Sequence, residues 1–356
     1  GGKPPPYIAP TWAHLIRKRG RSTLSKKKVN DGTTVNSILI RRPIKRWFPV
    51  FILPTFICFF IGFIWPFLQG IYLSFTKFMT PRDAELTIIP ALDAAQKHPE
   101  LIEEAGGSFN YYMEAFFRNY IKAFEDPSFG RAFWNTAGFA VVSIVLINVV
   151  AFAIAYALTQ KLKGSNLFRT VFFMPNLIGG VVLGYIWSMI FDAILKQYST
   201  FLTADPSYGF WGLVILVAWQ QIGYIMIIYI AGLQAVSEDM MEAAKIDGAN
   251  KWQTLFKVTI PNVMPSITIC TFLTLTNSFK MFDQNMALTE GLPIITQADG
   301  SQLKTTELLA LNIYSTYNIN RHWHGVAQAK AVIFFLLVAV LAIAQLSATR
   351  KKEVQQ

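Results

Sequence analysis

Six polar or aromatic residues interrupt two of the apolar runs in this sequence. They are Trp219, Gln220 and Tyr224 in one run, and Asn277, Lys280 and Asp283 in the other. Ionisable groups inside apolar segments usually face a bundle interior or a water-filled path, because burial in hydrocarbon is unfavourable for them. Aromatic faces stack on the C–H face of a sugar, and amide or carboxylate groups bond its hydroxyls. The six residues are therefore candidates for contact with an uncharged, hydroxyl-rich substrate.

A structural role is the alternative for each of these residues. Trp219 and Tyr224 suit the membrane interface, where aromatic side chains act as anchors. Lys280 and Asp283 lie at i and i+3, close enough on one helix face to form an ion pair that fixes helix packing. The sequence leaves both interpretations open.

Motifs for nucleotide, metal and hydrolytic chemistry are absent from the sequence. Gly1–Lys3 and Gly106–Ser108 lack the spacing of a phosphate-binding loop, so we do not expect the chain to bind or hydrolyse ATP. His322 and His324 have no Cys or carboxylate at zinc-like spacing and are expected to be surface histidines. No nucleophile elbow occurs. We expect no catalytic residue, no metal site and no cofactor in this chain, and no enzyme activity.

The elements that position these residues are apolar helices. Of the residues, 53% are hydrophobic and only 15% are charged, and several runs reach the roughly 20 apolar residues that cross a bilayer. The sequence predicts an all-α polytopic membrane protein with six transmembrane helices. The expected spans are 47–75, 132–158, 167–191, 210–233, 263–288 and 326–346. Gly180 and Gly184 in the third span are a weak signal for close helix packing.

Positive charge is concentrated before the first span. Residues 1–46 hold twelve Lys and Arg against the single acid Asp31, a surplus of +11 that equals the net charge of the chain. Such an arm indicates cytoplasmic retention first, with binding to lipid headgroups as the alternative, and does not favour nucleic-acid binding. The arm, the basic 161–169 loop, the 238–261 loop and the 351–356 tail fall on one side of six spans. We therefore expect both termini in the cytoplasm, with an acidic 76–129 cap and the 290–307 loop outside.

The 238–261 loop joins two short helical patterns through a glycine. Helix-forming residues precede Gly248, which permits a low-strain turn. Trp252, Leu255, Phe256 and Thr259 then recur at i, i+3, i+4 and i+7 and form one apolar face. A helical pair that docks into a partner and an amphipathic helix that rests on lipid headgroups both fit this pattern.

This loop resembles the EAA loop of ABC importer permeases. The residues that carry the resemblance are Glu242, Ala243, Ala244, Asp247, Gly248, Trp252, Phe256 and Pro261. Ile260 departs from the leucine that the family usually has. The resemblance implies a coupling helix that sits in a cleft of a cytoplasmic ATPase, with Glu242 as a charge contact and Gly248 as the elbow.

Two further stretches resemble carbohydrate ABC permeases in particular. Residues 280–293 are similar to that family's F-K-x-F-D…L-T-x-G-x-P run, although Glu290 replaces a usual glycine, and residues 219–234 resemble its fourth span. The resemblance covers most of 47–350, apart from an insertion at about 80–117. It implies the type I importer fold, with residues 47–350 as the permease domain.

The resemblance also implies function and partners. The chain would be one of two non-identical permease subunits of a bacterial cytoplasmic-membrane importer for a sugar or oligosaccharide. It would assemble with two ATP-binding subunits, which carry ATP and Mg, and with an extracytoplasmic solute-binding protein. The alternatives are a polyol, glycerol phosphate or amino-acid permease, or an ATP-independent secondary transporter; the absence of a convincing internal repeat argues against the last.

Overall fold

The computed structural model describes residues 48–78, 84–160, 163–298 and 300–350. The predicted basic arm and C-terminal tail lie outside these residues. The chain divides into two units, residues 1–65 and 66–356.

The described part of the first unit belongs to the helix Phe48–Ser74, which is long and apolar enough to span a membrane. It includes the π-helical turn η1, Phe60–Ile64, directly before α3, Trp65–Ser74. Pro66 has no backbone N–H to donate to the preceding turn, and a π-helical turn is one way for a helix to accommodate that loss. Phe51 and most other large apolar side chains of this segment are exposed, as on a helix that contacts lipid or another subunit.

Candidate spans in the described residues number four, or up to six if each of two bent helix pairs counts as one span. The spanning helices of the second unit are α8, Pro127–Thr159; α9, Ser165–Phe173, with η2, Met174–Leu177, and α10, Gly180–Leu195; α11, Pro206–Gln234; α15, Met264–Phe279; and α18, His324–Arg350, preceded by η6, Arg321–Trp323. The predicted all-α class is confirmed, and each predicted span overlaps one of these helices or helix pairs.

Two predicted spans are not single straight helices. The third bends by 99° between Leu177 and Gly180, and the fifth follows a 70° bend between Asn262 and Met264. The fifth also ends earlier than expected, at Phe279, and α16, Asp283–Leu288, follows as a separate helix. Pro175 and Pro265 stand close to the two bends, where the missing N–H weakens helix continuity.

Two long helices begin with the same three-residue sequence. Asp126 and Asp205 each precede a proline and a serine, and each carboxylate accepts a hydrogen bond from the serine N–H, at 2.9 and 2.7 Å. An N-cap aspartate followed by proline at the first helical position is a strong start signal. The starts of α8 and α11 are therefore encoded locally.

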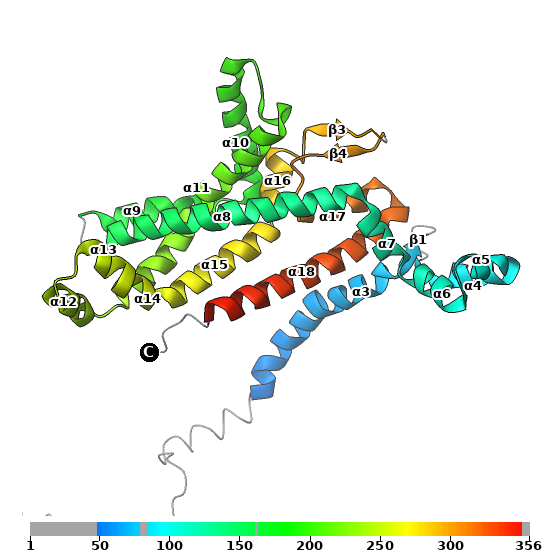
Figure 1. The fold of residues 1–356 in the computed structure, drawn as a ribbon, viewed down its shortest axis with the longest axis horizontal. Coiled ribbons are helices and arrows are strands. Elements are labelled where there is room, and N and C mark those ends of the chain that lie inside the picture. Colours follow the sequence, from blue (N-terminus) through cyan, green and yellow to red (C-terminus); the bar gives the residue numbers. More distant parts are fainter. Residues whose placement is uncertain (1–47, 79–83, 161–162, 299, 351–356) are drawn as a thin grey trace, which may run out of the picture. The chain divides into compact units, whose positions relative to one another are not determined.

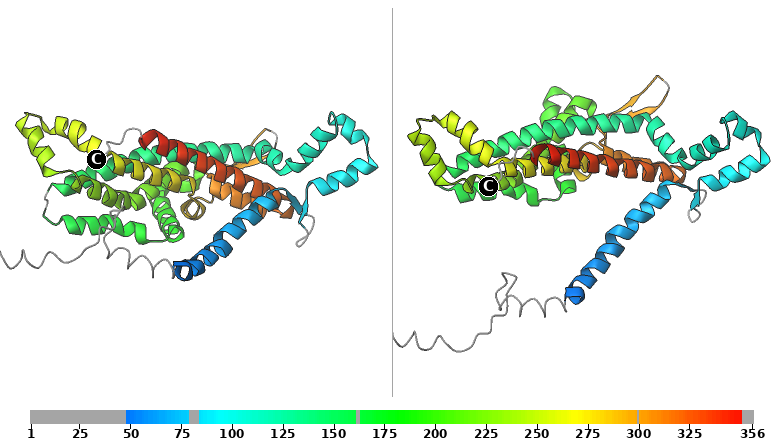
Figure 2. Two further views of the ribbon diagram at one scale, coloured as in Figure 1. Left: turned by 90° about the horizontal axis from the view of Figure 1, so that it is seen from below. Right: turned by 60° about the horizontal axis from the view of Figure 1, so that its bottom comes forward.

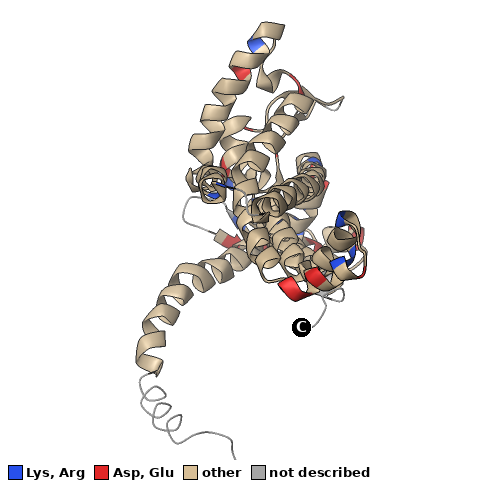
Figure 3. Cartoon of the chain, turned by 90° about the vertical axis from the view of Figure 1, so that its left-hand side faces the viewer, with Lys and Arg blue, Asp and Glu red and all other residues tan. Residues whose placement is uncertain are grey.

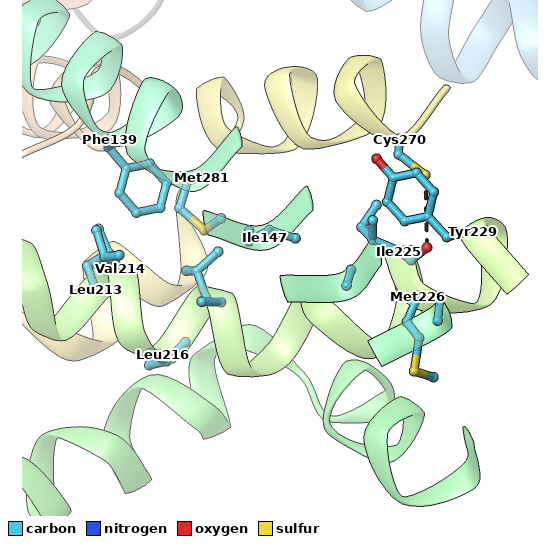
Figure 4. Close-up of a cluster of buried hydrophobic side chains, with 14 of the residues drawn as sticks. Phe139, Ile147, Leu213, Val214, Leu216, Ile225, Met226, Tyr229, Cys270 and Met281 are labelled. Carbon is cyan, nitrogen blue, oxygen red and sulfur yellow. Dashed lines mark hydrogen bonds between the residues drawn. The ribbon is translucent and has the colours of Figure 1, made fainter. Parts of the chain in front are cut away.

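The core of the second unit lies between α8, α11 and α15, which run alongside one another (Figures 1 and 2). Figure 4 shows Phe139 and Ile147 from α8 and Leu213 and Ile225 from α11 in this cluster. Polar bonds cross it: Tyr229 Oη donates to Asn148 Oδ1 at 2.7 Å, and Asn148 Nδ2 donates to Thr274 Oγ1 at 3.3 Å. Such interhelical bonds hold spans together where water is absent.

Short elements connect the spans at both ends of the bundle (Figure 1). On the side of α7 are β1, Thr76–Phe78; β2, Ala84–Leu86; α4, Ile88–Lys97; α5, Glu100–Glu104; α6, Ser108–Phe116; and α7, Arg118–Glu125. Between α10 and α11 are η3, Lys196–Tyr198, and η4, Leu202–Ala204. Between α16 and α18 are β3, Ile294–Thr296; β4, Gln302–Lys304; and α17, Leu309–Ile319. At the opposite end are α12, Glu238–Ile246; α13, Lys251–Thr254; η5, Leu255–Thr259; and α14, Ile260–Asn262.

The segment between the first two spans is a small helical cap, as expected. Phe75 stacks on Phe116 with ring centroids 4.4 Å apart and also contacts Tyr120, which closes the cap onto the end of α3. Asn119 Nδ2 donates to the carbonyls of Ser74 and Thr76, each at 2.8 Å. The strands β1 and β2 pair antiparallel, as do β3 and β4.

Charged residues colour little of the ribbon in Figure 3, in keeping with spans that face lipid or one another. Lys330 in α18 is an exception that the sequence reading overlooked: its side chain is 0% exposed. Its ammonium donates to Asp126 Oδ2 at 2.6 Å, Thr316 Oγ1 at 2.7 Å and Asn312 Oδ1 at 3.0 Å. The bonds join α18 to α17 and to the start of α8.

Candidate functional site

A polar pocket lies where α15 ends and α16 begins. It has a volume of about 360 Å³. Its lining consists of Gln221, Asn277, Lys280, Met281, Phe282, Asp283 and Gln284. Three amide side chains, one ammonium and one carboxylate therefore surround a space large enough for a small polar ligand.

Glycines of α10 position α16 beside this pocket. A Cβ on Gly180 would lie 2.8 Å from Asp283 Cβ and from Gln284 Cδ, and one on Gly184 would lie 2.5 Å from Ala287 Cβ. Side chains at these positions would push α16 away. The spacing of the two glycines, a weak signal in the sequence, therefore marks a close helix–helix contact.

An amide chain fixes the wall of the pocket. Gln284 Nε2 donates to Gln220 Oε1 at 2.8 Å, and Gln220 Nε2 donates to the carbonyl of Ile178 at 3.2 Å. The Ile178 carbonyl belongs to the break between η2 and α10, so the bend supplies an acceptor that a straight helix would not. Gln221 Oε1 is buried and has no hydrogen-bond partner among the described residues. That oxygen can accept a hydrogen bond from a ligand hydroxyl.

The structure brings together three of the six predicted substrate residues. Asn277, Lys280 and Asp283 line the pocket, and Gln220 supports it through Gln284. Trp219 instead stacks edge-on against Trp187, with ring centroids 5.4 Å apart, and Tyr224 packs against the apolar core. Successive residues of a helix point about 100° apart, so Trp219, Gln220 and Gln221 do not share a face.

The predicted helical pairing of Lys280 and Asp283 is wrong. Both side chains are exposed, and the described residues show no ion pair between them. Lys280 is the C-cap of α15, and α16 begins at Asp283, so no helix spans the two. The interruption leaves both charged groups available to the pocket.

The sequence reading missed Gln221 and Gln284 as lining residues. Gln221 follows the predicted substrate residue Gln220, and Gln284 follows the predicted substrate residue Asp283. The available signal was the density of amide side chains at the ends of two apolar runs. The helix break that turns them toward one space has no comparable sequence signal.

The second candidate site is the docking element, defined as α12 to α14, residues 238–262. Gly248 has a φ of 80°, in the left-handed region. The N–H of Ala249 donates to the carbonyl of Ala244 at 2.9 Å, and that of Gly248 donates to Lys245 at 3.1 Å. These two bonds form a Schellman motif, which ends α12 and sets the turn that the sequence predicts.

A reciprocal cap starts the next helix. Asn250 Oδ1 accepts from the N–H of Gln253 at 2.8 Å, and Gln253 Oε1 accepts from the N–H of Asn250 at 2.9 Å. Thr259 Oγ1 contacts Met241 Sδ at 3.8 Å and links η5 back to α12. The element is thus a folded helix pair with its own internal bonds.

The docking element exposes a set of large apolar side chains. Ile246 is 85% exposed, Trp252 70% and Phe256 60%, and the last two rings stack with centroids 6.1 Å apart. Trp252 and Phe256 therefore do not anchor the element on the bundle. Ile246 ends α12 and lies outside the apolar repeat that begins at Trp252, so that repeat does not predict its exposure.

The predicted apolar face is divided. Thr259 is buried and Leu255 is half-buried, whereas Trp252 and Phe256 are exposed. Residues Leu255–Thr259 form a π-helical turn, whose extra residue rotates the positions that follow. Only the N-terminal part of the predicted stripe is available to a partner.

Acidic and small residues complete the element. Ala244 is buried, whereas Glu242, Ala243 and Asp247 are exposed and Pro261, in α14, is half-buried. Glu242 also lines a cavity of about 470 Å³ between α12 and the ends of α8 and α11, together with Glu238 and Lys245. Its carboxylate is accessible for a charge contact.

Comparisons with known proteins agree with this geometry. The model of a family described as binding-protein-dependent transport system inner membrane component matches residues 147–353. The match includes the polar pocket and the docking element.

The chain aligns with nearly the whole length of two curated relatives. The probable starch degradation products transport system permease protein AmyD of Thermoanaerobacterium thermosulfurigenes is 38% identical over 317 residues, 87% of this chain and 96% of that protein. The multiple sugar-binding transport system permease protein MsmF of Streptococcus mutans is 26% identical over 319 residues, 87% of this chain and 97% of that protein.

A solved structure supports the fold. One chain of a bacterial ABC transporter involved in the import of the acidic polysaccharide alginate aligns with a TM-score of 0.64 and 18% identity. The alignment covers 88% of this chain and 98% of that chain. At this identity the likeness concerns the fold alone, which is that of an ABC importer permease.

Proposed function

Because the chain belongs to the family of binding-protein-dependent transport system inner membrane components, we propose that it forms half of the pathway of an ATP-driven importer for a sugar or oligosaccharide. Members of this family are membrane transport components and not enzymes. The observation that carries the proposal is the exposed docking element within the matched residues. A permease that has no ATPase site of its own needs a surface that contacts a separate ATPase and transmits its movement to the spans.

The substrate class rests on two lines of support. AmyD and MsmF are named for the transport of starch degradation products and of multiple sugars. The polar pocket offers three amide groups, and amides both donate and accept hydrogen bonds, as vicinal hydroxyls require.

The proposed assembly contains this chain, a second and different permease, two ATP-binding subunits that hold ATP and Mg, and an extracytoplasmic solute-binding protein. Both termini and the docking element face the cytoplasm in this arrangement, and the helical cap and the β3–β4 hairpin face the binding protein. Closure of the ATPases moves Glu242–Pro261 as a rigid body and switches the spans between inward and outward openings.

The proposed assembly is tested by purifying the tagged chain from its native host in mild detergent and identifying the co-purifying proteins by mass. We expect a second polytopic permease and a P-loop ATPase. The solute-binding protein encoded beside them is then screened by calorimetry against sugars, glycerol phosphate and amino acids. A chain that is folded and isolated would overturn the assembly, and a binding protein selective for amino acids would overturn the substrate class.

The role of the pocket is tested by Gln221→Leu, which removes the buried acceptor and keeps the side-chain size. Loss of one neutral hydrogen bond is worth about 1 kcal/mol, so the KM for uptake should rise about fivefold. Gln69→Leu, at an exposed position of α3, is the matched control and should leave the KM unchanged. An unchanged KM in the Gln221 variant would remove the pocket from the substrate path.

A further inference from the structure

A slot separate from both candidate sites lies between α9 and α11. The two helices touch where a Cβ on Gly223 would lie 1.8 Å from the carbonyl oxygen of Phe172. On the side of Gly223 toward the end of α11, a cavity of about 360 Å³ lies between them. Its lining consists of Arg169, Thr170, Phe173, Ile227, Ile230, Ala231 and Gln234.

The lining is apolar along its length and polar at one end. Phe173, Ile227 and Ile230 supply hydrocarbon walls, whereas Arg169 and Gln234 supply N–H donors. Ile227, Ile230 and Gln234 follow one another at i, i+3 and i+7 and so share a face of α11. This polarity matches a ligand with an anionic head and a hydrocarbon tail.

Arg169 has unused hydrogen-bonding capacity. Its Nε is buried and has no hydrogen-bond partner among the described residues. A buried donor without an acceptor is unfavourable by about 1–3 kcal/mol, and more for a charged group. The guanidinium fork fits a phosphate through two parallel hydrogen bonds. An oxyanion beside Arg169 would give this guanidinium an acceptor.

The surface around the slot is apolar. Phe168, Val171 and Phe172 on α9 are exposed, and they belong to a helix pair apolar enough to span a membrane. Gln234 lines both this slot and the cavity beside α12, which places the polar end on the same side of the bundle as the docking element. The polar end thus lies where headgroups meet hydrocarbon.

We propose that the α9–α11 slot binds an anionic phospholipid, with the headgroup phosphate on Arg169 and Gln234 and an acyl chain along Phe173, Ile227 and Ile230. The lipid would belong to the cytoplasmic leaflet. That choice of leaflet rests on the proposed function, which places the docking element in the cytoplasm. The lipid site itself does not depend on which solute is imported.

The test uses the full chain with its co-purifying subunits in bilayers of equal phosphatidylglycerol and phosphatidylcholine. After extraction in mild detergent, native mass spectrometry counts the retained lipids. The wild type should retain phosphatidylglycerol in excess. Arg169→Gln should reduce that excess about tenfold, the size expected for loss of a charge-assisted hydrogen bond.

Arg131→Gln is the matched control. Arg131 is also a half-buried arginine in a spanning helix, with a buried Nε that has no partner among the described residues, but it does not line the slot. This control should keep the phosphatidylglycerol excess. Ile227→Trp fills the apolar part of the slot without a change of charge and should also reduce retention.

Several results would overturn the proposal. Equal retention of the two lipids by the wild type, or an undiminished excess in Arg169→Gln, would remove the site. Displacement of the lipid by inorganic phosphate would mean that the acyl chain contributes nothing. Loss of the second permease from the Arg169→Gln assembly would mean that protein covers the slot. Failure of sugar uptake in the wild type would contradict the proposed function. It would not affect the lipid proposal, which is tested by lipid retention alone.

Discussion

At the scale of single residues, the ion pair between the buried Lys330 and the partly buried Asp126 ties three helices together. Lys330 Nζ and Asp126 Oδ2 are 2.6 Å apart, and Asn312 Nδ2 extends the network to Glu307 Oε2 at 2.8 Å. A buried cation needs such partners, because desolvation strongly opposes its charge. The network joins the start of α8 to α17 and α18 and fixes the geometry of that end of the bundle.

We expect Asp126→Asn to lower the free energy of unfolding by about 3–5 kcal/mol, because it removes the only carboxylate that is bonded to the buried Lys330 ammonium among the described residues and leaves Glu307 to act through Asn312. Asparagine is an equally good N-cap, so the start of α8 should persist. Thermal unfolding of the purified assembly, followed by tryptophan fluorescence, measures the loss. The double variant Asp126→Asn, Lys330→Met should recover more than half of it; no recovery would mean that the cap rather than the charge was lost.

The same pair predicts a pH dependence. Burial raises the pKa of Asp126, but the bonds and charge from Lys330 and the bonds from Ser128 outweigh this effect and hold the pKa below its usual value. A carboxyl with a lowered folded-state pKa contributes stability above its ordinary pKa of about 3.9 and loses it as the pH falls through the lower folded value. Unfolding midpoints of the wild type and Asp126→Asn should differ by a constant amount above about pH 5 and converge below about pH 4. Parallel curves at low pH would contradict the assignment.

The residue types of the polar pocket were predictable from the sequence, but their contacts were not. Asn277, Lys280 and Asp283 stand out as polar groups in an apolar run, and they do meet. The pairing of Lys280 with Asp283 failed because it assumed one helix through a position where α15 ends. Lys330 was overlooked because its partner Asp126 is 204 residues away, a distance over which helical periodicity carries no information.

At the scale of elements, the docking element depends on the backbone of Gly248. Its φ of 80° excludes proline, whose φ is fixed near −65°, and a Cβ at this position would meet nothing within 4 Å. We expect Gly248→Pro to leave membrane insertion normal and to abolish uptake. Gly248→Asn should retain most uptake, because asparagine tolerates the left-handed region. Radiolabelled sugar uptake in proteoliposomes of the full assembly distinguishes the two.

A glycine with the same geometry serves as the control for that experiment. Gly300 has a φ of 82° and open space around it in the β3–β4 turn, far along the chain from the docking element. Gly300→Pro should disturb its hairpin turn, which the proposed function places against the solute-binding protein. Retention of the ATPase on the assembly, rather than uptake, is therefore the readout that should stay normal in this variant. Normal ATP-coupled uptake by Gly248→Pro would remove the coupling role.

The contact between α10 and α16 makes a separate prediction. Gly184→Ala forces a Cβ to within 2.5 Å of Ala287 Cβ, and overpacking of this kind is unfavourable by about 1–3 kcal/mol. Gly138→Ala in α8 has nothing within 4 Å and should be neutral or slightly stabilising. Unfolding midpoints of the two variants give the comparison. Equal midpoints would mean that α16 moves without penalty and that the glycine spacing is incidental.

The sequence predicts the elements well where capping and hydropathy agree. The glycine turn of the docking element is a local signal, and it matches the end of α12. The aspartate–proline–serine starts of α8 and α11 are local signals too, but hydropathy placed the expected spans later, from 132 and 210. The 99° bend in the third span and the π-helical turn at Leu255–Thr259 were not foreseen. The sequence stays apolar through both irregularities, so a hydropathy pattern does not reveal them.

At the scale of the whole molecule, the second unit separates two kinds of surface along its bundle. The docking element lies at one end, and the cap, α17 and the hairpin lie at the other (Figure 1). The polar pocket lies between them, where α15 ends, and the break of the third span supplies the Ile178 carbonyl that holds its wall through Gln220. The 70° bend of the fifth span lies at the other end of α15, next to the docking element.

This separation predicts that the ATPase contact can be removed without damage to the substrate pocket. The exposed rings of Trp252 and Phe256 stack on each other and make up the largest apolar surface of the docking element. Large aromatic side chains dominate the energetics of such interfaces, so we expect Trp252→Ser with Phe256→Ser to reduce retention of the ATPase on a tagged chain by at least tenfold. The second permease should co-purify as before, and the unfolding midpoint should change little because neither ring is buried.

Tyr198→Ser with Phe201→Ser removes two other exposed aromatic side chains, outside the docking element, and should leave ATPase retention unchanged. If both double variants retained the ATPase equally, the contact would have to lie elsewhere; if both lost it, general loss of surface aromatic groups rather than the docking element would be responsible.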